Sequence, residues 1–260
     1  EVEAEIYSAE TLWNFSHNKA DLNVPVYHYL AHQQFQTEYL PILTQRITQM
    51  FVVPDVLPPS AVRPELKLQL TYPAAPETPF TAGVVLEPKH TLETPTVSVV
   101  PFHQDTRLYT LVMVDPDHPN QTTQRYEERC HWLATNLALS VSIASPATFD
   151  TVLPYLPPHP AQGSKRHRYT FLLLEQPNGG RDRLEVKLAT ESRDFNTRSF
   201  CAEHGLAVRG ITFFRAEYDE SVRGVYENIL GTPSPCYQAF PYIDPRVGPD
   251  GKMINRYKYF

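Results

Sequence analysis

Two carboxylates follow a strongly apolar stretch in "LVMVDPDHPN", residues 111–120. Asp115 and Asp117 end the run, and Pro116 and Pro119 restrict the backbone around them. One carboxylate could orient a histidine or bind a polar ligand. Alternatively, both could accept backbone N–H groups and simply hold a turn, as aspartates near prolines often do. The sequence around these residues leaves both interpretations open.

Two histidines occupy comparable positions at the start of apolar runs. His131 opens "HWLATNL" and His167 opens "HRYTFLLLEQ". Taken alone, each is typical of a core-edge histidine bonded to backbone. If the strand ends converge, the two imidazoles would form a small cationic cup for an anion, with Asp115 fixing one tautomer. A His/His/Asp metal site is the alternative that this residue set leaves open.

Several other kinds of chemistry have no support in the sequence. There is no G-x-S-x-G, no catalytic-cysteine signature and no phosphate-cradling glycine loop, so nucleophilic catalysis is disfavoured. Cys130, Cys201 and Cys236 are widely spaced and form no C-x-x-C. This usage indicates a reducing compartment and no zinc framework. No run of about 18 apolar residues predicts a membrane span.

Positive charge is local. The net charge of −6 and the pI of about 5.9 exclude a generally basic nucleic-acid-binding protein. Lys165, Arg166 and Arg168 surround His167 and could bind phosphates or form a solvated loop. Residues 233–260 are also net positive, and their bases are interleaved with aromatic residues, a pattern that suits nucleic acid as well as packing on protein.

Beyond residue 61, the chain predicts short strands joined by proline-rich connections, typical of a β-sandwich or open barrel. Helices are expected in "TRSFCAEHGL" and in "DESVRGVYENIL", with Asp219 as the cap and Gly231 as the stop. The strands are expected in "LKLQLTY", "TVSVV", "RLYTLVMV", "HWLATNL", "RYTFLLLEQ" and "RLEVKL".

Residues 1–60 are predicted to be helical, with Ser8 as an N-cap. Between residues 24 and 51, apolar residues recur every three or four positions and form one apolar helix face. This face is expected to pack on the chain's own domain or on a partner. Pro41 is expected to end or kink a helix. The acidic start without Met suggests a processed end.

These motifs together resemble the phosphatidylethanolamine-binding-protein family. "LYTLVMVDPDHP", "HWLATNL", "HRYTFLLLEQ" and "TFFRAEYDESVRGVYENILG" occur in that family's order and spacing, over roughly residues 61–231. The resemblance implies a mainly β fold with α-helices, namely a β-sandwich with C-terminal helices and a pocket for phosphate-type head groups. By motif, the pocket residues are Asp115, His131, His167 and Tyr226.

The pocket loop departs from the family pattern. In "PPHPAQGSKRHRY", His159 stands where the family has a glycine, Ala161 replaces a proline, and Lys165 replaces a small residue. A glycine allows close approach of a ligand, whereas an imidazole adds bulk and can occupy the site itself. The cup is therefore expected to persist as structure rather than as a head-group site.

The flanks resemble the branch of the family found in the large subunit of mitochondrial ribosomes, through "VPVYHYL", "QRITQM" and "AEYDESV". The resemblance implies a non-enzymatic structural component without a cofactor, located in the mitochondrial matrix at the central protuberance. It divides the chain into a helical N-terminal extension (1–60), the family domain (61–231) and an extended C-terminal tail (232–260). Its partners would be ribosomal proteins and ribosomal RNA, with RNA contacts by Lys165, Arg166, Arg168, Arg246, Lys252, Arg256 and Lys258.

Two other functions stay open at this stage. A free, soluble protein could bind phospholipid head groups or phosphorylated ligands and regulate a kinase or protease. This hypothesis requires an open cup at Asp115, His131 and His167. A hydrolase or metal enzyme using the same residues is the least supported function.

Overall fold

The structure is a computed structural model that describes residues 2–17, 19–75, 79–144, 146, 148–188 and 193–237. Most of the predicted C-terminal tail therefore lies outside the described residues. The same holds for four predicted RNA contacts, Arg246, Lys252, Arg256 and Lys258.

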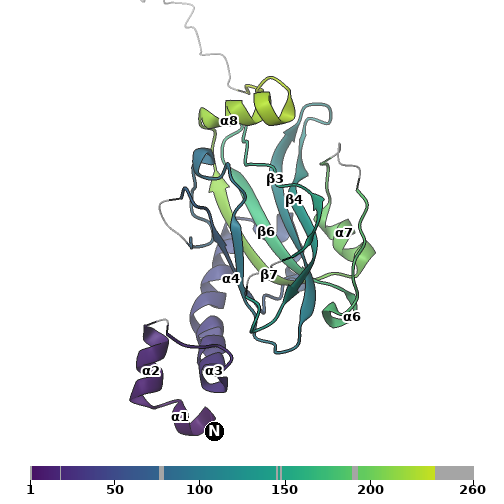
Figure 1. Ribbon diagram of the computed structural model, residues 1–260. Coiled ribbons are helices and arrows are strands. Elements are labelled where there is room, and N and C mark those ends of the chain that lie inside the picture. The colour runs from purple at the N-terminus through teal and green to yellow at the C-terminus, as the bar shows by residue number, and fades with distance from the viewer. Residues whose placement is uncertain are drawn as a thin grey trace, which may run out of the picture.

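A five-stranded antiparallel sheet forms the centre of the molecule (Figure 1). Its order is β5-β4-β3-β6-β7, so β3 is the central strand and β6 lies beside it. These two strands are buried on both faces, which explains why their sequences are continuous apolar runs rather than alternating patterns. The strands are β3 (Arg107–Asn120), β4 (Arg125–Leu139), β5 (Asp150–Leu153), β6 (His167–Glu175) and β7 (Ala207–Ala216).

A two-stranded sheet packs on one face of this sheet and completes the sandwich. It pairs β1 (Lys67–Thr71) with β2 (Thr96–Val100) in antiparallel register. Both strands alternate between buried and less buried residues, as expected for strands with one face on a core. Their inward side chains form one core cluster with those of β3, β6 and β7, including Leu68, Leu70, Val97, Val99, Leu111, Met113, Phe171 and Phe214.

Helices cover the opposite face of the five-stranded sheet. They are α4 (Leu40–Gln49), α5 (Val52–Asp55) and α7 (Thr197–His204). Leu43 and Ile47 of α4 belong to the same core cluster as Val112, Leu172 and Phe213 of the sheet. The last part of the predicted N-terminal extension is thus an integral layer of the domain, on the face that the small sheet leaves open.

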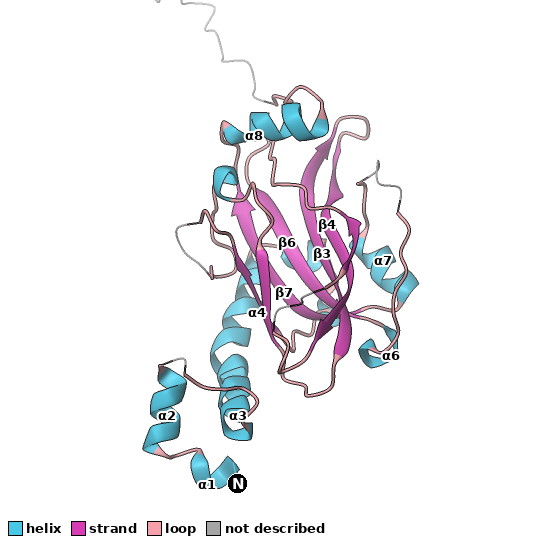
Figure 2. Ribbon diagram, viewed as in Figure 1, coloured by secondary structure: helices cyan, strands magenta, loops and turns pink. Residues whose placement is uncertain are grey.

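The first helices extend away from the sandwich, at the lower left of Figure 2. They are α1 (Val2–Glu5), α2 (Ala9–Ser16) and α3 (Pro25–Gln34), followed by a π-helical turn η1 (Phe35–Tyr39) that leads into α4. Ser8 precedes α2 as predicted but makes no side-chain capping bond.

Pro41 neither ends nor breaks the helical run, contrary to one form of the prediction. The N–H of Leu40 donates to the carbonyl of Phe35, five residues earlier. Proline lacks an N–H and its ring crowds the carbonyl four residues before it, so a widened turn just ahead of Pro41 lets the helix continue. The helix therefore runs from α3 through η1 into α4.

The predicted C-terminal helices are present. α8 (Ser221–Gly224) continues into η4 (Val225–Leu230), Asp219 accepts a bond from the Ser221 N–H, and Gly231 ends the helix at φ 64°. Asn196 caps α7 by accepting from the Ser199 N–H. The remaining short helices are η2 (Pro59–Ala61), η3 (Pro88–His90) and α6 (Pro177–Gly180).

The predicted strand in "RLEVKL" is wrong. This segment forms no strand. The side chain of Asn136 binds both backbone groups of Leu184: its Nδ2 donates to the Leu184 carbonyl and its Oδ1 accepts from the Leu184 N–H. Leu184 and Val186 still pack on the core. The strands β5 and β7 were not anticipated; Gly210 and two arginines interrupt the apolar pattern of β7.

Leu43→Ala tests whether α4 belongs to the domain core. Leu43 is 2% exposed, so its truncation is expected to lower the free energy of unfolding by about 2–5 kcal/mol. Its neighbour Ile42 is 50% exposed, and Ile42→Ala is expected to cost about 0.5 kcal/mol. Urea denaturation of the purified chain measures both values. Equal and small effects would show that α4 is dispensable for folding.

Candidate functional site

Asp115 binds the imidazole of His167 across two neighbouring strands. The Oδ2 of Asp115 lies 2.7 Å from Nδ1 of His167, and the two residues are 1% and 0% exposed. Backbone pairing between β3 and β6 stops at Val114 and Thr170, so the side-chain pair continues the connection where the ladder ends. Both interpretations of the DPD segment hold in part: Asp115 orients a histidine, and both aspartates accept backbone N–H groups.

The Asp115–His167 pair is ionised. Burial alone would raise the pKa of Asp115, but the charge of His167 and its hydrogen bond lower it to about 2. Burial alone would lower the pKa of His167, but Asp115 raises it. Ser164 Oγ donates to the Ala161 carbonyl and lies 2.7 Å from His167 Nε2, so that nitrogen must donate to Ser164. His167 therefore carries protons on both nitrogens, as an imidazolium does.

Asp117 holds Arg168, the residue after His167. Its carboxylate accepts from Nε, Nη2 and the backbone N–H of Arg168 at 2.7–2.9 Å. The Nη1 of Arg168 donates to the carbonyls of Met50 and Phe51 and to Asp55. Arg168 thus fastens the start of β6 to the N-terminal segment, and β3 continues to Asn120 instead of turning at the DPD segment. The guanidinium of Arg168 is engaged by these partners within the chain, and its assignment as an RNA contact stays a prediction.

His131 and His159 present lone pairs rather than protons. Nδ1 of His131 donates to the Leu156 carbonyl, and Nδ1 of His159 donates to the Pro157 carbonyl. Burial lowers the pKa of His131 to about 3 and that of His159 well below its usual value, so both rings are neutral. The Nε2 atom of each ring is then an acceptor. Two acceptors repel an anion, which removes the cationic character expected of the cup.

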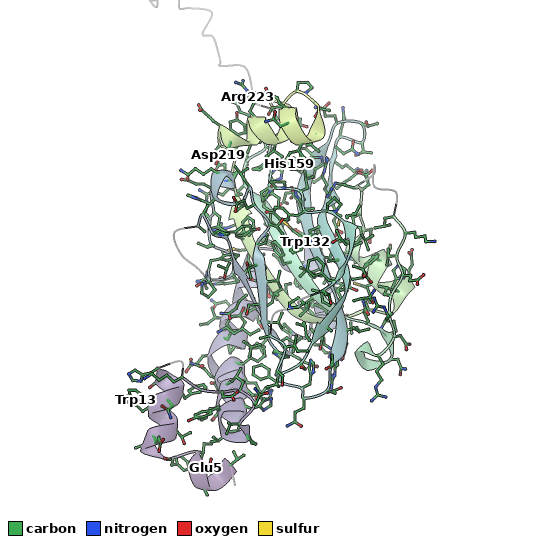
Figure 3. All side chains as sticks on the ribbon, in the orientation of Figure 1. Glu5, Trp13, Trp132, His159, Asp219 and Arg223 are labelled. Atoms are coloured by element: carbon green, nitrogen blue, oxygen red, sulfur yellow. The ribbon has the colours of Figure 1, made fainter. Side chains whose placement is uncertain are left out.

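His159 packs against the other site residues. Its ring centroid lies 4.9 Å from that of His131 and 5.2 Å from that of Tyr226, whose hydroxyl donates to the His159 carbonyl. Figure 3 shows His159 beneath the C-terminal helix that carries Arg223. His159 is 2% exposed and Tyr226 6%. The structure therefore brings all five predicted pocket residues together in a closed, solvent-shielded cluster.

The arrangement offers little for metal or hydrolytic chemistry. Asp115 already accepts from His167 and from the Asp117 N–H, and both nitrogens of His167 carry protons. Within the described ranges, no group of three or more His, Cys, Asp and Glu residues is placed to hold a metal ion. A metal site built on Asp115 and His167 would need atoms that already bind one another and Ser164.

Some site residues escaped the sequence analysis. Ser164 contacts His167 from three residues upstream, and a serine at that distance from a strand-opening histidine was the only local signal. Arg129 donates to Nε2 of His118, whose ring lies beside His159. Of the predicted surface bases, Lys165 is exposed and Arg166 pairs with Glu217 at 3.1 Å. Among the helices described, none is both long and apolar enough to cross a membrane.

The sequence of the chain is similar to that of a known protein family and of a ribosomal protein. The sequence pattern of the family described as "Phosphatidylethanolamine-binding protein" matches residues 73–215. The large ribosomal subunit protein mL38 of Schizosaccharomyces pombe is 29% identical over 220 residues, which cover 84% of this chain and 70% of mL38.

Two solved structures share the fold. The carboxypeptidase Y inhibitor, crystallised with its cognate proteinase, superposes with a TM-score of 0.56 at 24% identity over 72% of this chain and 99% of the inhibitor chain. A phosphatidylethanolamine-binding protein from Plasmodium vivax gives a TM-score of 0.53 at 17% identity, covering 67% of this chain and 97% of its own. These likenesses agree with the sandwich and its helices.

Arg168→Lys tests the clamp between β6 and the N-terminal segment. Lysine keeps the charge but cannot bind Asp117 with two nitrogens and reach two carbonyls, so we expect a loss of at least about 2 kcal/mol in the free energy of unfolding. Amide exchange of residues 46–56 should also accelerate.

Arg166→Lys is the matched control. Arg166 and Glu217 are both more than half exposed, so this change is expected to cost about 0–1 kcal/mol and to leave amide exchange unaltered. If the two variants behaved alike, the clamp would be unimportant for anchoring the N-terminal segment.

Proposed function

The chain belongs to the phosphatidylethanolamine-binding-protein family, and from this premise we propose that it is a structural component of the mitochondrial large ribosomal subunit, at the central protuberance. In this role it would reside in the mitochondrial matrix and catalyse no reaction. It would bind neighbouring ribosomal proteins and ribosomal RNA.

The extent of the similarity to mL38 carries this proposal. The family pattern spans residues 73–215, which is 143 residues, whereas the alignment with mL38 covers 220 residues. The alignment must therefore include chain beyond the family domain on at least one side. The flanks distinguish this chain from a bare sandwich, and a relative that shares more than the sandwich is a better guide to its role.

The closed site also supports a structural role. Asp115, His131, His159 and His167 are all at most 2% exposed, and each of the two neutral histidines donates its one N–H to a backbone carbonyl. A free phospho-ligand-binding protein needs an accessible cup with donors directed at the anion. The proposed vestigial cup therefore disfavours the alternative of a head-group-binding regulator of a kinase or protease.

The ends of the chain would make the ribosomal contacts. Large apolar side chains are exposed in the N-terminal region, among them Tyr7 at 85% in the turn after α1 and Trp13 at 48% on α2, and they would pack on partner proteins. Exposed cations would meet RNA phosphates. We assign this second role to Lys165 and Arg166 on the pocket loop and to Arg246, Lys252, Arg256 and Lys258 of the tail.

Sedimentation of the epitope-tagged full chain from mitochondrial lysates tests the proposal. The chain is expected to move with large-subunit particles and to stay with them when magnesium is chelated to separate the subunits. A variant with the four tail bases changed to Gln should dissociate at lower salt, because fewer phosphate contacts reduce the salt dependence by about one unit per lost contact.

The matched control neutralises four exposed bases of the sandwich, Arg125, Arg181, Lys187 and Arg223, and should keep the salt dependence of the wild type. A chain that stays at the top of the gradient as a free protein would refute the ribosomal role. Identical salt dependence of the two variants would refute the tail contacts.

A further inference from the structure

A short segment after the last helix lies across the closed site. This segment, residues 232–237, contains two prolines that restrict its backbone, and we call it the strap. The N–H of Thr232 donates to the Tyr226 carbonyl at 3.1 Å. The strap therefore begins directly at the helical turn whose tyrosine packs on His159.

The other end of the strap binds the pocket loop. The N–H of Tyr237 donates to the Gln162 carbonyl at 2.7 Å, and Cys236 pairs with Gln162 in a parallel β-bridge. Gln162 lies between His159 and Ser164, two loop residues that contact the other histidines of the site. The strap thus holds the loop at its middle.

The turn between β3 and β4 provides a further anchor. Nε2 of Gln121 donates to the Tyr237 hydroxyl at 3.3 Å. Between its anchors the strap forms one wall of a cavity of about 590 Å³, and Arg129 and Tyr226 line the same cavity. Four of the six strap residues are exposed and the other two are half-buried. Because the strap borders a cavity and is not part of the core, it can detach without unfolding the sandwich.

The pocket loop depends on contacts from outside. Several of its hydrogen bonds are local: His159 Nδ1 donates to the Pro157 carbonyl, and Ser164 donates to the Ala161 carbonyl through its N–H and its hydroxyl. Local bonds shape a loop but do not attach it to the sandwich. The Tyr226 hydroxyl, which donates to the His159 carbonyl, and the strap attach it at two points.

We propose that the strap keeps the pocket loop closed, so that the start of the C-terminal tail controls access to His159 and the histidines behind it. Detachment of the strap would release the middle of the loop. Ser164 could then leave Nε2 of His167, and that N–H would be free to donate to an anion. The closed state of the site is in this sense a property of the tail as well as of His159.

The strap continues directly into residues 238–260, which the proposed function assigns to ribosomal contacts. A partner that holds the tail would therefore act on the pocket loop through Gln162. This last step rests on the proposed function, whereas the closure of the loop by the strap does not.

Two substitutions of Tyr237 in the full chain separate the backbone bond from the side chain. Tyr237→Pro removes both the N–H donor and the hydroxyl, whereas Tyr237→Ala removes the hydroxyl alone. Amide exchange of residues 157–165, measured by mass spectrometry, should accelerate about fivefold or more in the proline variant, because a hydrogen bond is lost. It should change less than about threefold in the alanine variant, since the bond to Gln121 is long and exposed.

A disulfide provides a second test by attaching the strap covalently. Gln162→Cys places a thiol opposite Cys236, which is free and exposed. Paired residues of neighbouring strands lie about 5 Å apart, within the Cα separation that a disulfide allows. Diamide should oxidise the two thiols to a disulfide, and dithiothreitol should reduce it again. Carbethoxylation of His159 by diethyl pyrocarbonate should be about tenfold slower in the oxidised than in the reduced form, and amide exchange of the loop should slow with it.

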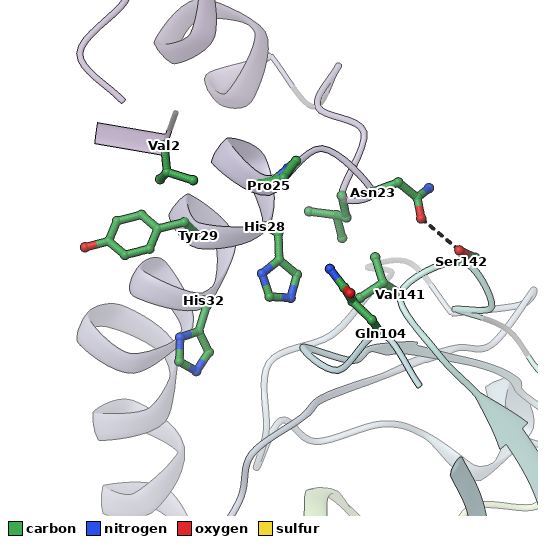
Figure 4. A pocket seen from close by; sticks show the side chains of 10 residues that line it. Val2, Asn23, Pro25, His28, Tyr29, His32, Gln104, Val141 and Ser142 are labelled. Carbon is green, nitrogen blue, oxygen red and sulfur yellow. Dashed lines mark hydrogen bonds between the residues drawn. The ribbon is translucent and has the colours of Figure 1, made fainter. Parts of the chain in front are cut away.

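Gln33→Cys is the matched control. Gln33 is exposed on α3, and Figure 1 shows α3 and α8 at opposite ends of the molecule. The chain just before α3 contacts the sandwich at a different turn, where the Ser142 hydroxyl donates to Asn23 (Figure 4). This variant should form no disulfide with Cys236, and diamide should leave the reactivity of His159 unchanged.

Three results would overturn the inference: equal loop exchange in the two Tyr237 variants, no disulfide after Gln162→Cys, or a disulfide that leaves the reactivity of His159 as it was. All of these measurements use the isolated chain. The strap can therefore be refuted while the chain still sediments with ribosomal particles, and it can be supported if the chain does not.

Discussion

The buried pair of Asp115 and His167 joins two strands at the point where they stop exchanging backbone hydrogen bonds. Removing one partner of such a pair costs about 3–5 kcal/mol, because the other charge is left uncompensated in the core. Asp117 and Arg168 repeat the same connection one step further and extend it to the N-terminal segment. The pocket loop, α5 and the ends of β3 and β6 are thus positioned by two carboxylates two residues apart.

A site built on a buried ion pair can keep its structure without a bound ligand. The imidazolium of His167 is satisfied by Asp115 and Ser164, so it needs no anion to balance it. His159 supplies the bulk that fills the space next to His131 and contributes an acceptor where an anion would require a donor. In this account the cluster holds the strand ends together, and the N-terminal helices, attached through α4 and Arg168, are free to carry an interaction surface.

The sequence was a good guide wherever one residue type determines the local structure. Gly231 ends a helix in the left-handed region, and continuous apolar runs mark β3 and β6, which are buried on both faces. The prediction from sequence failed where a distant side chain binds backbone groups. Asn136 binds the backbone of Leu184, and "RLEVKL" is not part of a sheet. The bonds of Arg168 within the chain were not predicted for a similar reason, since its partners Met50 and Phe51 lie more than a hundred residues away.

Calorimetry with phosphoethanolamine is the most direct test of the central claim that the chain's own histidine has replaced the ligand. The account predicts no measurable heat for the wild-type chain at ligand concentrations up to about the millimolar range, where a binding free energy of about −4 kcal/mol would be visible. His159→Gly removes the imidazole and restores the family's residue. This variant should not bind phosphoethanolamine more weakly than the wild-type chain does. Measurable wild-type binding that disappears in His167→Ala would contradict the account.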